Sequence, residues 1–195
     1  MTKEERQKRT MEAVKKIVAE KGLDGFSIRQ VAELTGINET LIYRDFYTKD
    51  QLLDACYQEV QNEIADICST IGPLTLNTRE QAITAMKNMW ITCFQYLLEH
   101  RDNTLFMRNY RESSYRQKLL EASDNRKPKY FFDACDRFAM VLSSDIDMHC
   151  TWIYVIDFSI EFAMRILTGE LPQDENSVSR IWQIMFNGLG TNNLI

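Results

Sequence analysis

The stretch that decides the fold is SIRQVAELTGINETLIYRDFYTK, which runs from residue 27 to residue 49. It contains two short helical patterns separated by Gly36, a residue suited to the positive φ of a tight helix-to-helix turn. Ser27 and Asn38 are both of types that cap helix N-termini, so each predicts that a helix begins directly after it. The second helix leads into an aromatic and basic segment, YRDFYTK. This order of features predicts a helix-turn-helix unit, the arrangement that places a reading helix in the major groove of DNA.

The second helix of this unit has two chemically different faces. Ile42 and Phe46 are i,i+4 neighbours, which lie on one side of a helix, and we expect them to pack inward. The opposite face is short and polar, as a helix in the major groove requires. A three-helix packing unit without contact to DNA has the same periodicity, so the pattern alone leaves both interpretations open. The side chains that the pattern places on or near the outer face are those of Arg29, Gln30, Asn38, Glu39, Thr40, Tyr43 and Arg44.

The rest of the chain is predicted to be helical as well. Only 7 Gly and 3 Pro among 195 residues leave too few turn formers for a β-rich fold, so we predict an all-α protein. We expect a small N-terminal domain over residues 1–48 and a larger helical domain over residues 49–195, which a long helix joins to it. Apolar periodicity and capping residues predict helices over about residues 3–21, 28–35, 39–46, 49–71, 78–100, 103–111, 115–123, 128–142, 147–168 and 175–188.

The formal net charge of the chain is −5, but the charges are unevenly distributed. Residues 1–50 contain 10 Lys or Arg and 9 Asp or Glu, whereas residues 51–195 contain 13 Lys or Arg and 19 Asp or Glu. An acidic body repels a duplex, so this asymmetry favours contact between DNA and the N-terminal end of the protein.

Cysteine usage and the apolar runs predict a soluble cytoplasmic protein without a membrane segment. The cysteines, at positions 56, 68, 93, 135 and 150, are odd in number and form no C-x-x-C pair, so we expect buried, reduced thiols. The first ten residues, MTKEERQKRT, have no apolar core and therefore do not form a secretory signal. Asp157, Glu161 and Arg165 interrupt the longest apolar zone, residues 151–167, which excludes a membrane span there.

A combination of residues in the N-terminal part is more specific than the helix-turn-helix pattern alone. It consists of Ala13, Gly22, Ser27, Val31, Ala32, Gly36, Ile37, Ile42, Tyr43, Phe46, Lys49 and Leu52. In this combination, residues 6–60 resemble the TetR family of transcriptional regulators. The resemblance implies that Ser27, Tyr43 and Lys49 contact phosphate, the last at a helix N-terminus that also favours an anion. It further implies that a second set of side chains faces the bases or the backbone of the DNA. These are Arg29, Asn38, Glu39, Thr40 and Arg44.

Three residues depart from the pattern of this family. Asp45 stands where the family usually has a neutral residue near the DNA backbone, so its carboxylate either turns inward, pairs with Arg44 or Lys49, or weakens the grip on phosphate. Leu41 is bulky for a surface that faces DNA, and either contacts a thymine methyl group or is partly buried. Thr40 replaces a residue that is commonly small or Pro, which can shift the start of the helix.

The TetR resemblance also implies a ligand-binding and dimerisation body, with an effector pocket and a dimer bundle formed by the last two long helices. We predict that the dimer contacts include Trp152, Ile153, Ile156, Ile160, Ile181, Trp182 and Met185. Met and aromatic side chains adapt to apolar ligands, although the same stripes also fit a plain hydrophobic core. On this basis the candidate pocket residues are Met86, Met89, Trp90, Cys93, Phe94, Met107, Tyr110, Phe131 and Phe138.

The remaining polar residues of the body do not predict a catalytic site. Asp157, Glu161 and Arg165 are spaced at i, i+4 and i+8, and form either a solvated stripe with an intrahelical Glu161–Arg165 pair or a polar seam inside the pocket or the dimer. The histidines, His100 and His149, have acidic or thiol neighbours that point in different directions on a helix. We therefore predict no metal, no cofactor and no enzyme activity.

These patterns lead to one functional hypothesis and one rival. The chain is predicted to be a homodimeric repressor that binds a palindromic operator in double-stranded DNA and is released by a small-molecule effector. The rival is a TetR-fold protein-interaction adaptor or coactivator with reduced operator binding. Asp45 and the acidic net charge are the features that favour the rival.

Overall fold

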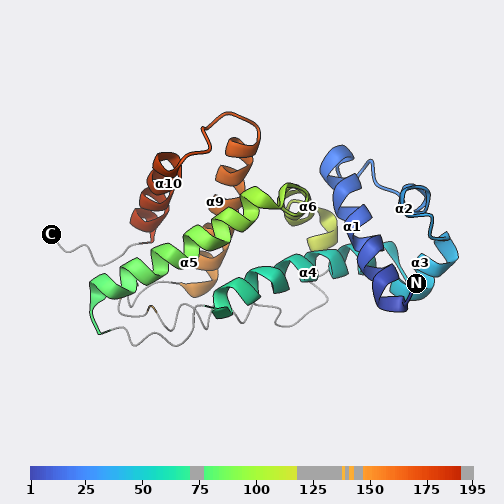
Figure 1. The fold of residues 1–195 in the computed structure, drawn as a ribbon, viewed down its shortest axis with the longest axis horizontal. Helices are drawn as coiled ribbons and strands as arrows, with labels where there is room; N and C mark the ends of the chain where they lie inside the picture. Colours follow the sequence, from blue (N-terminus) through green and yellow to red (C-terminus); the bar gives the residue numbers. More distant parts are fainter. Residues whose placement is uncertain (71–76, 118–137, 139–140, 143–146, 190–195) are drawn as a thin grey trace. The chain divides into compact units, whose positions relative to one another are not determined.

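The structure, a computed structural model of the chain, describes residues 1–70, 77–117, 138, 141–142 and 147–189. Every regular element in these residues is a helix, so the predicted all-α class is confirmed. None of the described helices is long and apolar enough to cross a membrane. The helices predicted over residues 115–123 and 128–142 lie largely outside the described residues. The helices are α1 (Lys3–Lys21), α2 (Ile28–Thr35), α3 (Glu39–Phe46), α4 (Lys49–Thr70), α5 (Arg79–Glu99), α6 (Arg101–Arg111), α9 (Met148–Leu167) and α10 (Glu175–Gly188) (Figure 1).

The ends of the first helix follow the caps that its sequence predicts. Thr2 and Glu5 form a capping box, in which Thr2 Oγ1 accepts from the Glu5 N–H at 3.1 Å and Glu5 Oε2 accepts from the Thr2 N–H at 2.8 Å. The helix stops at Gly22, whose φ of 70° is readily adopted only by glycine. By contrast, α6 begins at Arg101, two residues before the predicted start.

The chain divides into two compact units that do not coincide with the predicted domains. The first unit contains Met1–Asn62 and His100–Arg126, and the second contains Glu63–Glu99 and Lys127–Ile195. The predicted boundary after residue 48 therefore lies inside the first unit. That unit also holds α6, which packs on α1, and the larger part of α4, whose Glu59 pairs with Lys15 of α1 at 2.7 Å.

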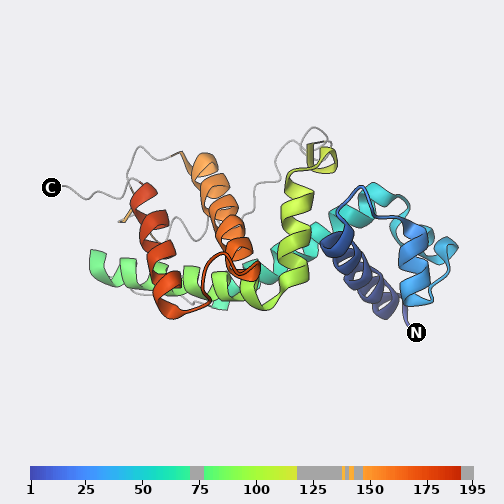
Figure 2. The same cartoon turned by 90° about the horizontal axis from the view of Figure 1, so that it is seen from above.

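In the first unit, α1 is the central helix and packs on α6, α2 and α3. Its inner face repeats at helical spacing and places Val14 and Val18 in the core, where both are fully buried. Val31 of α2 and Ile42 of α3 close the same core from the other side. The three helices α1, α2 and α3 lie together in both views of the ribbon (Figures 1 and 2).

Polar and aromatic contacts hold α6 against α4 within the first unit. The Tyr110 hydroxyl donates to the carboxylate of Asp54, and the Tyr110 ring stacks on that of Tyr57 with centroids 4.6 Å apart. Arg111 Nη1 donates to the Tyr57 hydroxyl at 3.1 Å. These contacts explain why α6 belongs to the first unit although a long stretch of chain separates the two helices.

In the second unit, α5 packs against both α9 and α10, and α9 and α10 lie side by side (Figure 2). Large aromatic residues fill the contact, since Trp90 and Phe94 of α5 and Trp182 of α10 are all buried. The last two helices approach closely at Gly188. A Cβ atom at this position would overlap the hydroxyl of Tyr154 on α9, so the close contact requires glycine or a displaced tyrosine.

Candidate nucleic-acid interface and ligand cavity

The start of α2 is fixed by a reciprocal pair of side-chain caps. Ser27 Oγ accepts from the Gln30 N–H at 3.3 Å, and Gln30 Oε1 accepts from the Ser27 N–H at 2.9 Å. Arg29, between them, is exposed and its Nε donates to Glu33 Oε1 at 2.9 Å along the outside of the helix. All three predicted contact residues of α2 are therefore at its N-terminal end, and Ser27 and Gln30 also serve as caps.

The turn between α2 and α3 is defined by backbone and side-chain hydrogen bonds. Gly36 adopts the left-handed conformation, with φ 70° and ψ 10°, and its N–H donates to the Ala32 carbonyl at 2.8 Å. Thr35 Oγ1 accepts from the Ile37 N–H at 3.1 Å, and Asn38 Oδ1 accepts from the Thr40 N–H at 2.8 Å. These bonds set the direction in which α3 leaves the turn.

The outer face of α3 is open to solvent. Glu39, Thr40, Tyr43 and Arg44 are all exposed, whereas Ile42 is buried. The predicted division of this helix into an inner and an outer face is therefore observed. Leu41 is half-buried, which agrees with the second of its two interpretations.

Asp45 is not on the outer face, because its carboxylate turns inward to Arg6 of α1. Arg6 Nε donates to Asp45 Oδ2 at 2.6 Å and Arg6 Nη2 donates to Asp45 Oδ1 at 2.9 Å. The two hydrogen bonds from the guanidinium hold the pKa of the Asp45 carboxyl below its ordinary value of 3.8. The first of the three interpretations of Asp45 is thus correct. Its partner is Arg6, which the sequence did not indicate, rather than Arg44 or Lys49.

Lys49 begins α4, but its ammonium group is held within the first unit. Lys49 Nζ donates to the Phe26 carbonyl at 3.0 Å, and lies 4.8 Å from the centroid of the Phe26 ring and 5.6 Å from that of Tyr115. The residue is half-buried. Contact between Lys49 and phosphate stays a prediction, while the structure gives the side chain a second role in fixing the loop before α2.

Tyr47 is a surface residue that the sequence analysis did not select. It follows α3 with a φ of 60°, a conformation that is uncommon for a residue other than glycine, and its side chain is 76% exposed. Leu34 and Tyr43 are also exposed large apolar side chains of the stretch 27–49. The signal was present in the sequence, since Tyr47 belongs to the aromatic and basic segment after the reading helix.

Comparison with known proteins places this stretch in a family. The sequence profile described as "Bacterial regulatory proteins, tetR family" matches residues 11–56, which contain α2, α3 and the turn between them. Residues 11–56 belong to the TetR family. TetR proteins are regulators rather than enzymes, so the predicted absence of enzyme activity is confirmed by the family.

One curated relative and several solved structures extend the TetR comparison. HTH-type transcriptional regulator PksA of Bacillus subtilis (strain 168) is 28% identical over 86 residues, which are 44% of this chain and 42% of that protein, so the match spans less than half of the relative. A TetR family regulator from Shewanella sp. PV-4 covers 97% of this chain and 98% of its own with a TM-score of 0.77 and 14% identity. The fatty acid degradation regulator FadR from Bacillus halodurans covers 95% and 97% with a TM-score of 0.68 and 18% identity. At these identities the solved structures establish the fold.

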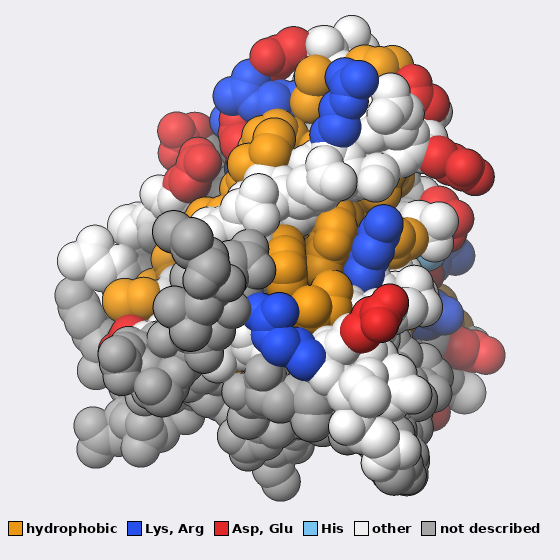
Figure 3. Space-filling view, turned by 90° about the vertical axis from the view of Figure 1, so that its left-hand side faces the viewer, with side chains coloured by type: hydrophobic (Ala, Val, Ile, Leu, Met, Phe, Trp, Pro, Cys, Tyr) orange, Lys and Arg blue, Asp and Glu red, His pale blue; other side chains and the backbone are white. Residues whose placement is uncertain are grey.

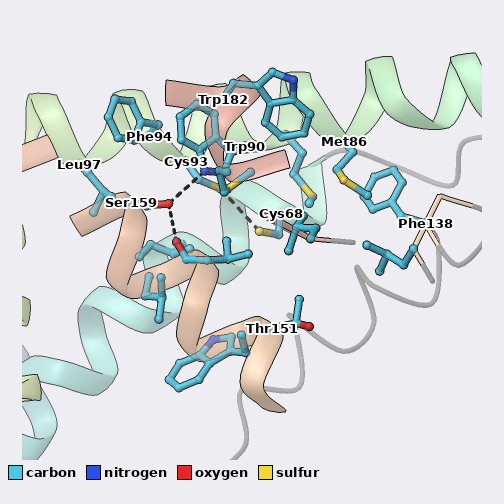
Figure 4. Close-up of a pocket in the computed structure, with 18 residues that line it drawn as sticks. Cys68, Met86, Trp90, Cys93, Phe94, Leu97, Phe138, Thr151, Ser159 and Trp182 are labelled. Carbon is cyan, nitrogen blue, oxygen red and sulfur yellow. Dashed lines mark hydrogen bonds between the residues drawn. The ribbon is translucent and has the colours of Figure 1, made fainter. Parts of the chain in front are cut away.

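The second unit contains a cavity of about 110 Å³. Its walls come from α4, α5, α9 and α10 and from the short described segments around residue 140 (Figure 4). The predicted pocket residues that line it are Met86, Met89, Trp90, Cys93, Phe94 and Phe138.

Two predicted pocket residues do not line this cavity. Met107 and Tyr110 are fully buried on α6, in the first unit, and do not line the cavity. The helical periodicity showed that these side chains are buried but not which helices they face. Phe131 lies outside the described residues.

The few polar groups in the cavity wall are engaged with one another. Trp90 Nε1 donates to Ser159 Oγ at 3.0 Å, and Ser159 Oγ donates in turn to the Val155 carbonyl at 2.6 Å (Figure 4). The thiols of Cys68 and Cys93 are 3.7 Å apart. The hydrogen bond with Cys68 and burial both raise the pKa of the Cys93 thiol, so it stays protonated at neutral pH.

Most of the predicted dimer residues are buried in the core of the second unit and are not exposed on its surface. Trp152, Ile156, Trp182 and Met185 line the cavity, Ile160 and Ile181 are buried and Ile153 is half-buried. A pattern that is apolar on nearly every side could not indicate which face is inward. The apolar side chains that remain accessible on these helices include Tyr154, Phe158, Phe162 and Ile184.

The polar seam of α9 contains the predicted intrahelical Glu161–Arg165 pair and does not line the cavity. Arg165 Nη2 donates to Glu161 Oε1 at 2.9 Å and Arg165 Nη1 donates to Glu170 Oε1 at 2.6 Å, with Asp157 exposed one turn earlier. Among the described residues no cluster of His, Cys, Asp and Glu could hold a metal.

The cysteines are only partly as predicted. Cys56 and Cys68 are buried and Cys93 is half-buried, but Cys150, in the first turn of α9, is exposed. Cys135 lies outside the described residues.

Proposed function

We propose that the protein is a homodimeric transcriptional repressor that binds a palindromic operator through α3 and is released by a small molecule in its second unit. The observation that carries this proposal is the open outer face of α3, where Thr40, Tyr43 and Arg44 are exposed on a helix whose inner face is fixed. The pairing of Asp45 with Arg6 removes a carboxylate that would repel phosphate from this face. The match to PksA, a transcriptional regulator by name, supports the same activity.

A twofold dimer presents two copies of α3 to the two halves of a palindrome. The surface that we assign to the dimer lies on α9 and α10. The rings of Tyr154, Phe158 and Phe162 form a row along α9 with successive centroids 5.6 and 4.4 Å apart, and Ile184 of α10 is 55% exposed. Figure 3 shows the side of the structure that is on the left in Figure 1, where apolar side chains lie between charged ones. A patch of this kind favours contact with another protein surface.

Helix α4 gives the effector a route to the reading helix. Its C-terminal half supplies Ile64 and Cys68 to the cavity wall, and its first residue, Lys49, follows α3 after a short connection. A ligand that displaces the end of α4 therefore changes the position of α3. Because the two binding free energies are linked, operator DNA must lower the affinity for the effector by the same factor.

The test of DNA contact is a salt series with DNA from the protein's own promoter region. Arg44→Ala removes an exposed cation from α3 without a described structural contact, whereas Lys49→Ala would also remove the hydrogen bond to Phe26. We expect Arg44→Ala to weaken binding and to reduce the slope of log K against log salt by about 2, one for each copy of α3.

Lys16→Ala is the matched control, because it removes one exposed positive charge from α1, outside the stretch 27–49 and outside the assigned dimer surface. It should leave both the affinity and the salt slope unchanged. Equal effects of the two substitutions, or no specific complex at low salt, would exclude operator contact through α3. The adaptor alternative rested partly on Asp45, and the inward pairing of that residue removes this support.

A further inference from the structure

The cavity in the second unit has a wall of unusual composition. Five lining side chains carry sulfur and five are aromatic. Among the described residues that line it, none is charged, and hydroxyl groups come from Thr151 and Ser159. The sulfur-bearing residues are Cys68, Met86, Met89, Cys93 and Met185, and the aromatic ones are Trp90, Phe94, Phe138, Trp152 and Trp182.

The hydroxyl groups of the wall and the Trp90 N–H already donate hydrogen bonds within the protein. They are therefore not available as donors to an anionic ligand. The Trp90 N–H is donated to Ser159, the Ser159 hydroxyl is donated to the Val155 carbonyl, and the Thr151 hydroxyl is donated to the Asp147 carbonyl at 2.8 Å. The Cys93 thiol has a raised pKa and so provides no negative charge to attract a cation. An ionised ligand would lose its hydration here without gaining a partner of opposite charge.

The aromatic side chains are already arranged in stacked and tilted pairs. The Trp90 ring lies 4.6 Å from that of Phe94 and 5.7 Å from that of Trp182, measured between centroids. A further ring would extend this stack, and methionine and cysteine sulfur atoms make favourable contacts with aromatic rings. In Figure 4, Met86 and Phe138 lie at one end of the cavity, and Phe94 and Leu97 lie at the other.

The size of the cavity limits the ligand to one ring. Engineered apolar cavities of about 150 Å³ hold a single benzene molecule. The cavity here is about 110 Å³, so a monocyclic ligand fits after small rotamer changes of flexible side chains such as Met86 and Met89. We infer that the effector is an uncharged, apolar, monocyclic aromatic molecule that stacks on Trp90 and Trp182. The role of this molecule as an effector rests on the proposed function, whereas its binding in the cavity does not.

The protein carries its own reporter for this binding. All 3 tryptophans of the chain, Trp90, Trp152 and Trp182, line the cavity, so intrinsic tryptophan fluorescence reports only on its surroundings. The experiment titrates the full chain with four compounds of similar size. They are toluene, methylcyclohexane as the ring without π electrons, benzoate as the anion and benzylammonium as the cation.

We expect toluene to change the fluorescence in a saturable manner and to raise Tm. Benzoate and benzylammonium should bind about 100-fold more weakly or not at all, and methylcyclohexane should bind more weakly than toluene. Absence of saturable toluene binding, or an ion that binds as tightly as toluene, overturns the inference. Methylcyclohexane binding as tightly as toluene overturns its aromatic part.

A pair of substitutions on α5 places the ligand in the cavity. Cys93→Phe adds a ring to the wall and should abolish toluene binding, whereas Thr92→Phe adds the same ring at an exposed neighbouring position and should preserve it. Unchanged toluene affinity in a folded Cys93→Phe protein overturns the site. If that variant does not fold, the four-compound series on the unmodified protein still decides.

Operator binding with and without toluene separates this inference from the proposed function. Release of DNA by toluene supports both. Saturable toluene binding without an effect on DNA leaves the ligand class standing and overturns effector release as the function of the cavity.

Discussion

On α3, the exposed guanidinium group of Arg44 is followed by a buried carboxylate, that of Asp45. The partner of Asp45 is Arg6, which precedes it by 39 positions and belongs to α1. This pair neutralises the carboxylate and ties α3 to α1 by two hydrogen bonds. A residue that looks unfavourable for DNA binding in the sequence therefore contributes to the placement of the reading helix.

Asp45→Asn should lower the stability of the protein at neutral pH. The asparagine keeps the size of the side chain but cannot neutralise Arg6, so we expect Tm to fall by a few degrees. Because the folded-state pKa of Asp45 lies below 3.8, its stabilising contribution is complete above that pH and is lost as the pH falls through the lowered value. The difference in Tm between the two proteins should thus be constant near neutrality and close in acid.

The same variant tests the orientation of Asp45 toward DNA. If the carboxylate is directed inward, operator affinity of Asp45→Asn stays close to that of the unmodified protein. A carboxylate that faced phosphate would give the opposite result, a clear gain in affinity on its removal. Asp24→Asn, at an exposed turn position of the same unit, controls for the change in net charge and should affect neither Tm nor DNA binding.

At the scale of the element, α3 is a helix of 8 residues that depends on its caps. Asn38→Ala removes the acceptor for the Thr40 N–H and should reduce the free energy of unfolding by about 1 kcal/mol, measured by urea denaturation. Asn38→Asp keeps the acceptor and should preserve stability, but it adds a negative charge to the DNA-facing end and should weaken operator binding. If both variants lost stability equally, the cap would not be the role of Asn38.

The local elements could be predicted from the sequence more completely than their contacts. Ser27, Gly36 and Asn38 define α2 and α3 because capping and a left-handed turn depend on neighbouring residues alone. The Arg6–Asp45 pair and the position of Tyr110 depend on residues far apart in the chain, which periodicity does not specify. For the same reason, periodicity indicated that Met107 and Tyr110 of α6 are buried, but not that they lie in the first unit, away from the residues of α5 that line the cavity.

At the scale of the whole molecule, the proposed function requires a dimer whose two reading helices engage one operator together. Affinity for the palindrome then exceeds affinity for one half-site, because binding of the first subunit holds the second at a high effective concentration. Ile184 is the sharpest test of the assigned surface, because it is a large apolar side chain that is 55% exposed, whereas the neighbouring Ile181 and Met185 of the same helix are buried. A change at this position can disturb an interface without disturbing the core.

Ile184→Glu should therefore give a folded monomer, with unchanged helicity, when its mass is measured by light scattering at micromolar concentration. Its affinity for the palindromic operator should fall by about 100-fold or more, since each half-site is then bound separately. Asn88→Glu adds the same charge at an exposed position of α5, outside the surface assigned to the dimer, and should remain a dimer with nearly normal affinity. A dimeric Ile184→Glu protein would move the interface away from this face of α10, and a monomeric unmodified protein would contradict the two-copy mechanism itself.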